Sequence, residues 1–320
     1  MIRRTSLCCL ATLGLALALA VAPATASSRP HHPVGHDFLE NTIRTGTSLS
    51  VPGENIWSCR PPAAHPRPVV LVHGTGGNQA SNWRTYAALL ANHGYCVFAL
   101  TYGLSPQLAA SPYEVGGMAD IRGSARELRD FVAKVLRRTG ARRVDLVGHS
   151  QGTFMPDYYV RFLGGARNVD HYVSLASLWH GEGAGVFGQL VHSGAAYGFD
   201  PAKLVPVCTS CGQMVTGSAI VRRLRSGPHG VAAPGVSYTN IVTRYDDVVL
   251  PYTSGIETGH PNMRNIVLQD VCPNDFSDHL EIASSPNAAR IVLNTLDPAH
   301  AQPVRCRTTL PADGLVTPGT

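Results

Sequence analysis

The segment Arg143-Val144-Asp145-Leu146-Val147-Gly148-His149-Ser150-Gln151-Gly152 joins an apolar run to a Gly-x-Ser-x-Gly pentapeptide. The run contains β-branched residues and predicts a buried strand, and residues 153–163 can continue as a helix. A serine at the apex of a tight turn between a strand and a helix is typical of a nucleophile elbow. The helix that begins at Gln151 directs free backbone N–H groups at any oxyanion formed there. We therefore predict that Ser150 is a nucleophile.

Short apolar runs alternate with helical patterns along most of the chain. The runs predict strands at residues 68–72, 95–100, 143–147, 170–176, 237–243 and 263–269. The helical patterns lie at residues 82–93, 117–138, 151–163 and 286–296. This order predicts an α/β fold, with a mostly parallel sheet and helices on both faces. A chain of 320 residues, of which 44% are hydrophobic, can form one such domain around a single core.

The first 26 residues have the three parts of a secretory signal peptide. Arg3 and Arg4 form a charged start, residues 7–21 are apolar, and Ala24-Thr25-Ala26 is a typical cleavage site. The apolar run is too short for a membrane anchor, and no later run is long enough to span a bilayer. We predict a secreted, extracellular chain whose single domain is residues 27–320. Sec and twin-arginine export both stay open.

The cysteines agree with export. Cys8 and Cys9 lie in the predicted signal peptide, and an even number remains, which in an exported chain indicates disulfides. The remaining cysteines are Cys59, Cys96, Cys208, Cys211, Cys272 and Cys306. The Cys-x-x-Cys at 208–211 has no second cysteine or histidine pair nearby at zinc spacing. We interpret it as a small structural disulfide.

Two stretches lie outside the alternating pattern. Residues 27–53 are rich in proline, histidine and serine, and we expect an irregular arm that wraps the domain. Residues 177–234 are rich in glycine, and we expect a cap over the serine that lines the substrate pocket. Leu178 and Trp179 follow the strand after the elbow, so we expect them to line an acyl pocket. Ordinary core packing explains these two residues equally well.

A glycine-rich turn, His73-Gly74-Thr75-Gly76-Gly77, ends the first predicted strand. It lacks the Gly-Lys-Ser/Thr of a phosphate-binding loop and the G-x-G-x-x-G of a dinucleotide site. Glycines let a backbone approach a substrate closely, and Thr75 offers both an N–H and a hydroxyl. We predict an oxyanion hole formed by Thr75 together with the backbone N–H of Gln151.

A serine hydroxyl is a poor nucleophile near neutral pH, and it needs an imidazole to take its proton and a carboxylate to orient that imidazole. In chains with a nucleophile elbow the order is serine, then the acid, then histidine, each on a loop after a strand. Asp246 directly follows a predicted strand, and His279 lies in the loop after the next one. We predict that these two residues complete a catalytic triad with Ser150.

Other carboxylates and histidines fit this order less well. His260 precedes the last predicted strand, Asp247 points away from its neighbour Asp246, and Asp278 is expected to be a solvated loop residue. The remaining histidines that we considered are expected to be packing or loop residues (His73, His149) or cap residues within reach of a substrate (His180, His192).

Four motifs in order resemble those of the secreted bacterial class 2 lipases and, more distantly, of Candida antarctica lipase B. They are His73-Gly74-Thr75-Gly76, the pentapeptide at 148–152, residues 245–251 (Tyr-Asp-Asp-Val-Val-Leu-Pro) and Asp278-His279. The resemblance, which runs from about Trp57 to Cys306, implies an α/β-hydrolase fold with the same triad and oxyanion hole. It also implies that Cys59 pairs with Cys96 and Cys272 with Cys306, and hence Cys208 with Cys211. The region predicted to be a cap matches poorly, so the resemblance implies no substrate preference.

Taken together, these features predict a carboxylic ester hydrolase, a lipase or esterase that cleaves a lipid or a small acyl ester through an acyl-enzyme. An acyltransferase or a polyester hydrolase would use the same triad, whereas a binding module without catalysis would not need it intact. The chemistry needs no metal or organic cofactor. The net charge of +5 comes from scattered basic residues, which argues against nucleic-acid binding. Transient contact with a lipid interface is compatible with the prediction, and no protein partner is implied.

Overall fold

The computed structural model describes residues 30–183, 185 and 207–312. The predicted signal peptide and His192 lie outside this range. The described residues from His31 to Ala312 group into one compact unit by their contacts. Among the described residues, no helix is long and apolar enough to cross a membrane.

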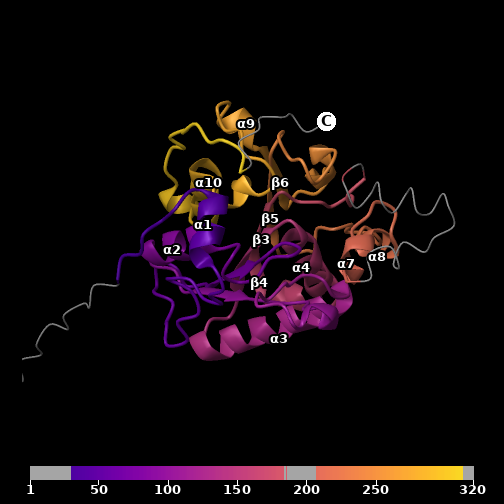
Figure 1. Cartoon of the computed structure of the whole chain (residues 1–320), viewed down its shortest axis with the longest axis horizontal. Helices are drawn as coiled ribbons and strands as arrows, with labels where there is room; N and C mark the ends of the chain where they lie inside the picture. The colour runs from indigo at the N-terminus through magenta and orange to yellow at the C-terminus, as the bar shows by residue number, and fades with distance from the viewer. Residues whose placement is uncertain (1–29, 184, 186–206, 313–320) are drawn as a thin grey trace, which may run out of the picture. The chain divides into compact units, whose positions relative to one another are not determined.

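The strands form one sheet in the order β2-β1-β3-β4-β5-β6 (Figure 1). Their bounds are β1 Val69–Val72, β2 Val97–Leu100, β3 Val144–His149, β4 Val169–Leu175, β5 Ser237–Val242 and β6 Met263–Val267. Each neighbouring pair is parallel. The predicted parallel sheet is confirmed, and the carboxyl ends of its strands lie at one edge, where α/β folds place their sites.

The helices follow the predicted pattern with a few differences. Their bounds are α1 Phe38–Thr45, α2 Arg84–Asn92, α3 Ile121–Thr139, α4 Gln151–Phe162, α7 Thr209–Gln213, α8 Ala219–Leu224, α9 Leu268–Val271 and α10 Pro286–Leu296. The prediction of an irregular arm at 27–53 is wrong at α1, where Asp37 caps the helix by accepting a hydrogen bond from the Glu40 N–H at 2.7 Å. The last predicted strand also ends early, because the chain turns into α9 at Leu268.

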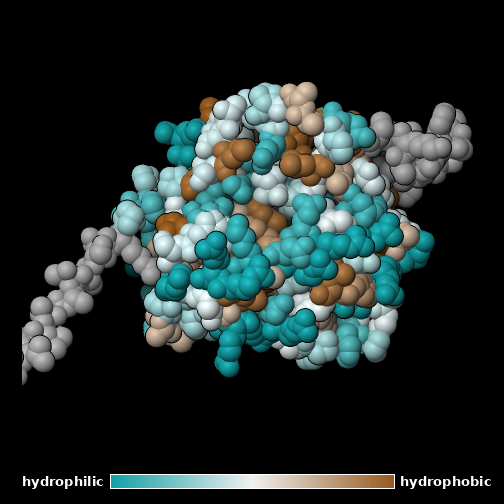
Figure 2. All heavy atoms as spheres, turned by 90° about the horizontal axis from the view of Figure 1, so that it is seen from below, coloured by the Kyte–Doolittle hydropathy of each residue, from teal (hydrophilic) through white to brown (hydrophobic). Residues whose placement is uncertain are grey.

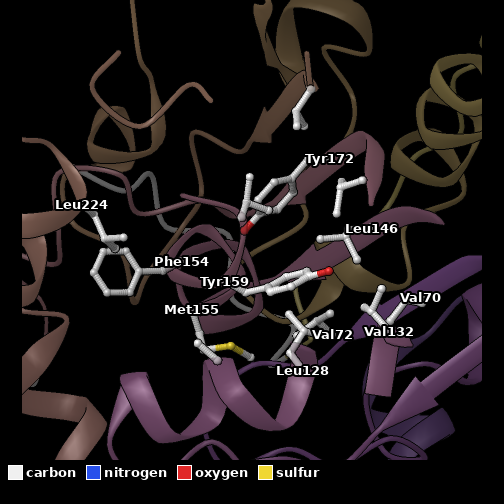
Figure 3. Packing of buried hydrophobic residues seen from close by; sticks show 14 of the residues in the cluster. Val70, Val72, Leu128, Val132, Leu146, Phe154, Met155, Tyr159, Tyr172 and Leu224 are labelled. Carbon is white, nitrogen blue, oxygen red and sulfur yellow. The ribbon is translucent and has the colours of Figure 1, made fainter. Parts of the chain in front are cut away.

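Each strand sends alternate side chains to opposite faces of the sheet, so the molecule has two cores. On one face, Val70 and Val72 of β1 share a buried cluster with α3 and α4 through residues such as Leu128 and Tyr159 (Figure 3). On the other face, Leu71 belongs to a second cluster with α2 and α10. Figure 1 shows α3 on one side of the strands and α2 and α10 on the other. The sheet therefore holds β3 and its following turn between two packed layers.

Helix α3 shows how the outer layer is built. Asp120 caps its start by accepting hydrogen bonds from the N–H groups of Arg122 (2.9 Å) and Gly123 (3.2 Å), and Gly140 ends it at φ 75°. Its apolar residues face the sheet, whereas its arginines point to solvent. The face of the molecule in Figure 2, seen from the side of α3, is accordingly mostly hydrophilic, with small separate hydrophobic patches.

Three disulfides join the described cysteines: Cys59–Cys96, Cys208–Cys211 and Cys272–Cys306. These are the pairs that the resemblance implies. The first ties the segment before β1 to the start of β2, and the third ties the end of α9 to the C-terminal segment. The second closes a loop of four residues at α7.

Candidate active site

Ser150 occupies a strained turn between β3 and α4, with φ 55° and ψ −125°. The turn depends on two glycines that allow the main chain to come unusually close. A Cβ on Gly148 would lie 1.9 Å from the carbonyl oxygen of Gly152, and one on Gly152 would lie 1.9 Å from that of Val72. Both positions therefore accept only glycine. Close packing of α4 against β1 presents the serine hydroxyl at the edge of the sheet.

The structure brings Ser150, His279 and Asp246 together. His279 Nε2 lies 2.9 Å from Ser150 Oγ, and its Nδ1 lies 2.9 Å and 3.0 Å from the two carboxylate oxygens of Asp246. Asp246 lies four residues past the end of β5 rather than directly after the strand. Its Oδ1 also accepts hydrogen bonds from the N–H groups of Val248 (3.1 Å) and Val249 (2.7 Å), which fix the carboxylate.

The charge of His279 is set by two opposing effects. Burial lowers the pKa of this imidazole, but the carboxylate of Asp246 and the nearby Asp247 and Asp278 outweigh burial, so that the pKa is raised above its ordinary value. Asp278 is not the solvated residue that we expected. It is buried, and it accepts hydrogen bonds from the backbone N–H groups of Leu280 (3.0 Å) and Glu281 (2.7 Å).

His149 has a positioning role that the sequence did not reveal. Its Nε2 lies 2.8 Å from the backbone carbonyl oxygen of His279, and this carbonyl can only accept, so Nε2 carries the proton. Burial lowers the pKa of His149 to about 3, which keeps the ring neutral. His149, the residue between Gly148 and Ser150, thus holds the main chain of His279 in place. Only its place inside the pentapeptide could have indicated this.

The predicted oxyanion residues lie beside the serine. Within the described residues, neither the backbone N–H of Thr75 nor that of Gln151 donates a backbone hydrogen bond. A Cβ on Gly74 would lie 2.9 Å from the Cβ of Ser150, which shows how close this loop comes. The loop is fixed by the Gly76 N–H, which donates to Gly116 O at 2.9 Å. Two free N–H groups at a fixed position can stabilise a developing negative charge.

A cavity of about 520 Å³ opens at Ser150 and His279. Its apolar lining residues are Phe38, Val115, Met118, Leu178, Met214, Val248, Val249 and Leu280. Leu178 thus lies where we predicted it, whereas Trp179 is not among the lining residues and packs against Tyr172 and Tyr238 in the core. The predicted cap region also contributes Glu182, Cys208 and Cys211 to the wall.

Helix α1 forms part of the same wall through Phe38 and Thr42. The N–H of Phe38 donates to Glu281 Oε2 at 2.8 Å, and His36 Nδ1 donates to the carbonyl oxygen of Ser284 at 2.9 Å. The start of α1 is therefore attached to the segment that follows the base. The pocket is closed on this side by a part of the chain that we expected to be irregular.

The other candidate residues lie in different surroundings. His180 Nε2 lies 3.1 Å from Glu257 Oε1, and His260 Nε2 lies 3.9 Å from Glu257 Oε2. His73 is buried, and burial lowers its pKa to about 4, as expected of a packing residue. Asp247 accepts a hydrogen bond from the backbone N–H of His279 at 3.3 Å, so it does contact the base.

Asp145, Asp170 and His171 lie close enough together to hold a metal ion. Arg67 pairs with Asp145 at 2.8 Å, and Arg143 pairs with Asp170 at 2.6 Å. These ion pairs neutralise both carboxylates at the start of β3 and β4, away from the serine. The two arginines therefore explain why these acidic side chains can lie close together.

The sequence profile of the family described as Lipase (class 2) matches residues 66–291. The chain belongs to the class 2 lipase family. Members of this family are carboxylic ester hydrolases.

One solved structure shows the fold of this chain at low sequence identity. Aspergillus fumigatus lipase B is 19% identical with a TM-score of 0.57, over 83% of this chain and 64% of the fungal chain. This chain thus spans less than two thirds of the fungal protein. Bacillus licheniformis lipase BlEst2 in its mature form is 14% identical with a TM-score of 0.49, over 74% of this chain and 94% of that chain.

The elbow gives a direct test of close packing. Gly152→Ala places a Cβ against the Val72 carbonyl, so we expect the free energy of unfolding to fall by about 3 kcal/mol or more. Gly123→Ala in α3 is the matched control, because a Cβ there meets nothing within 4 Å. It should leave stability unchanged or raise it by about 0.5–1 kcal/mol. Denaturant unfolding measures both, and equal stability of the two variants would contradict the packing described.

Proposed function

We propose that this class 2 lipase is a secreted serine hydrolase that cleaves acyl esters, with Ser150 as nucleophile, His279 as base and Asp246 as the acid. The observation that carries the proposal is the pair of hydrogen bonds of His279, to the Ser150 hydroxyl at 2.9 Å and to the Asp246 carboxylate at 2.9 Å. This is the arrangement that raises the nucleophilicity of a serine. Its position in a largely apolar cavity suits an acyl chain.

The reaction follows from the positions of these groups. His279 takes the proton of Ser150 as Oγ bonds to the ester carbonyl carbon, and the carbonyl oxygen becomes an oxyanion. The backbone N–H groups of Thr75 and Gln151, with the Thr75 hydroxyl, hold this oxyanion. The imidazolium then gives its proton to the leaving alcohol, and the acyl group stays on Ser150. Water attacks the acyl-enzyme with His279 again as base, which releases the acid and restores the serine. Loss of one oxyanion donor should raise the barrier by ~3 kcal/mol.

The nucleophile is tested by hydrolysis of p-nitrophenyl butyrate and p-nitrophenyl palmitate. Ser150→Ala should lower kcat/KM by about 10³-fold or more, because it removes the hydroxyl that hydrogen-bonds to His279 Nε2. Ser81→Ala is the control, since Ser81 lines the same cavity without contacting the base. The ratio of the two rates separates an esterase from a lipase. Wild-type activity in Ser150→Ala would show that Ser150 is not the nucleophile.

The raised pKa of His279 predicts the acidic side of the pH profile. A general base acts in its neutral form, so kcat/KM should fall as the pH drops through a value above about 6.5. Asp247→Asn removes a charge that raises the pKa of His279, so the midpoint of this fall in kcat/KM should move to lower pH. Asp130→Asn, on the exposed side of α3, should leave it in place. An unchanged midpoint in Asp247→Asn would refute the role of that charge.

Export is supported by the three disulfides, which persist in oxidising compartments. The protein recovered from the medium of an expressing bacterium should begin at Ser27, and its cysteines should react with a thiol reagent only after reduction. Intact-mass spectrometry measures both. A cell-retained protein that keeps residues 1–26 would contradict secretion.

A further inference from the structure

A cavity of about 370 Å³ lies between α10 and the C-terminal segment, and it shares no lining residue with the cavity at Ser150. One wall is a face of α10, whose lining residues at positions 286, 289, 290 and 293 follow the spacing of a helix. Residues 302–307 contribute the other wall. The proposed catalytic groups do not line this cavity, so the reason for its composition has to be sought elsewhere.

The cavity is lined by three arginines, and none of its described lining residues is an aspartate or a glutamate. Arg290 extends from α10, and Arg305 and Arg307 extend from the C-terminal segment. Within the part of the chain that the structure describes, none of these three guanidinium groups forms an ion pair or donates a hydrogen bond. A guanidinium group stays charged at any pH near neutrality. Three like charges around one cavity repel one another, and an anion between them would compensate this repulsion.

The other titratable groups near the arginines leave this positive charge in place. His36 also lines the cavity; burial lowers its pKa below the ordinary value, and the charge of Arg307 adds to this effect. Asp37 and Glu281 line a neighbouring cavity that includes Arg307. Asp37 caps α1, and Glu281 accepts a backbone N–H of the same helix. Burial raises the pKa of Glu281 to about 8, so this group carries little negative charge at neutral pH.

The main chain that carries Arg305 and Arg307 is fixed. Cys306 lies between them and is bonded to Cys272. The N–H of Arg307 donates to Asn287 Oδ1 at 2.9 Å, and Asn287 Nδ2 donates to the carbonyl oxygen of Arg307 at 2.8 Å. Asn287 is buried in α10, so these reciprocal bonds attach the segment to the helix that carries the third arginine. A fixed main chain lowers the entropy lost when a ligand binds.

The chemistry of the lining indicates a phosphate group. Guanidinium groups bind phosphate and carboxylate oxygens through paired N–H donors. A phosphate monoester carries a charge of about −1.5 to −2 near neutral pH, so it compensates three cations better than a single carboxylate does. Leu89, Leu293 and Pro303 add apolar surface to the same cavity, which can contact the carbon atoms attached to a phosphate. The volume lies within the range of about 300–1,000 Å³ that is typical of ligand sites.

We propose that the cavity between α10 and residues 302–307 is a binding site for a phosphate group, held by Arg290, Arg305 and Arg307. Free phosphate and the phosphate headgroup of an anionic lipid share this chemistry. The site is separate from Ser150, His279 and Asp246, so this inference goes beyond the proposed function and does not depend on it.

Calorimetric titration with inorganic phosphate tests the free anion. The ionic strength should be about 0.15 M, where exposed charges more than about 8 Å apart are screened. The wild type should bind with a Kd below about 1 mM. The triple variant Arg290→Gln, Arg305→Gln, Arg307→Gln should bind at least about 10-fold more weakly, because charge-assisted hydrogen bonds are lost. It should fold normally, since these guanidinium groups have no protein partner to lose.

A second triple variant is matched in charge. Arg126→Gln, Arg137→Gln and Arg138→Gln remove the same number of exposed arginines from α3, away from the cavity. Phosphate binding should be unchanged in this variant. Equal weakening in both triple variants would overturn the proposal, because net charge alone would then explain the binding.

Sedimentation with vesicles tests the lipid headgroup. Vesicles of phosphatidylcholine that contain phosphatidic acid should sediment the wild type and the α3 variant but not the variant of the cavity, and vesicles of phosphatidylcholine alone should sediment none. Binding of inorganic phosphate without binding to vesicles would identify the free anion as the ligand, and the reverse would identify the lipid. Absence of both in the wild type would overturn the proposal. Ser150→Ala should bind phosphate as the wild type does, so this test is independent of the nucleophile.

Discussion

The close approach of α4 to β1 is the constraint on which the site depends. It exists because Gly152 leaves no side chain between the helix and the carbonyl of Val72, and because Gly148 in β3 leaves none in front of the carbonyl of Gly152. The approach forces Ser150 into a left-handed backbone conformation and lifts its hydroxyl above the sheet edge. The first N–H of α4 has no helical partner, so one turn presents both the Ser150 hydroxyl, which we propose as nucleophile, and the N–H of Gln151, which we propose as oxyanion donor. The parallel strands then bring the loops with Thr75, Asp246 and His279 to the same edge.

Electrostatics around His279 shows a balance between burial and charge. The imidazole is almost fully buried, which favours its neutral form, yet three carboxylates stand around it and favour the cation. For the neighbouring His149, burial and the charge of His279 outweigh the raising effect of Asp246, so the pKa is lowered and the ring stays neutral as a fixed donor. Two buried histidines 5.1 Å apart between ring centres thus have different protonation properties because of their neighbours. His279, the proposed base, has to gain and lose a proton, whereas His149, which holds its main chain, has to stay in one protonation state.

Much of this arrangement could be predicted from local patterns. The parallel sheet follows from the alternation of apolar runs and helical patterns, and the expected places of Asp246 and His279 follow from the order of loops. What the sequence did not reveal depends on contacts between distant segments. Helix α1 is stabilised by its hydrogen bond to Glu281. Asp278 can be buried because its carboxylate accepts hydrogen bonds from the backbone N–H groups of the next turn. Trp179 lies beside a lining residue along the chain but faces the core, because adjacent residues can point in different directions once a strand has ended.

The wall that α1 contributes lies before the residues that the family profile matches. The stretch shared with the class 2 lipase family begins at residue 66, whereas Phe38 and Thr42 precede it. A segment outside the shared region is therefore built into the chamber that receives the substrate. The shape of the cavity thus depends on a part of the chain that the matched profile does not include, and this part is attached to the segment after His279 through the bond from the Phe38 N–H to Glu281.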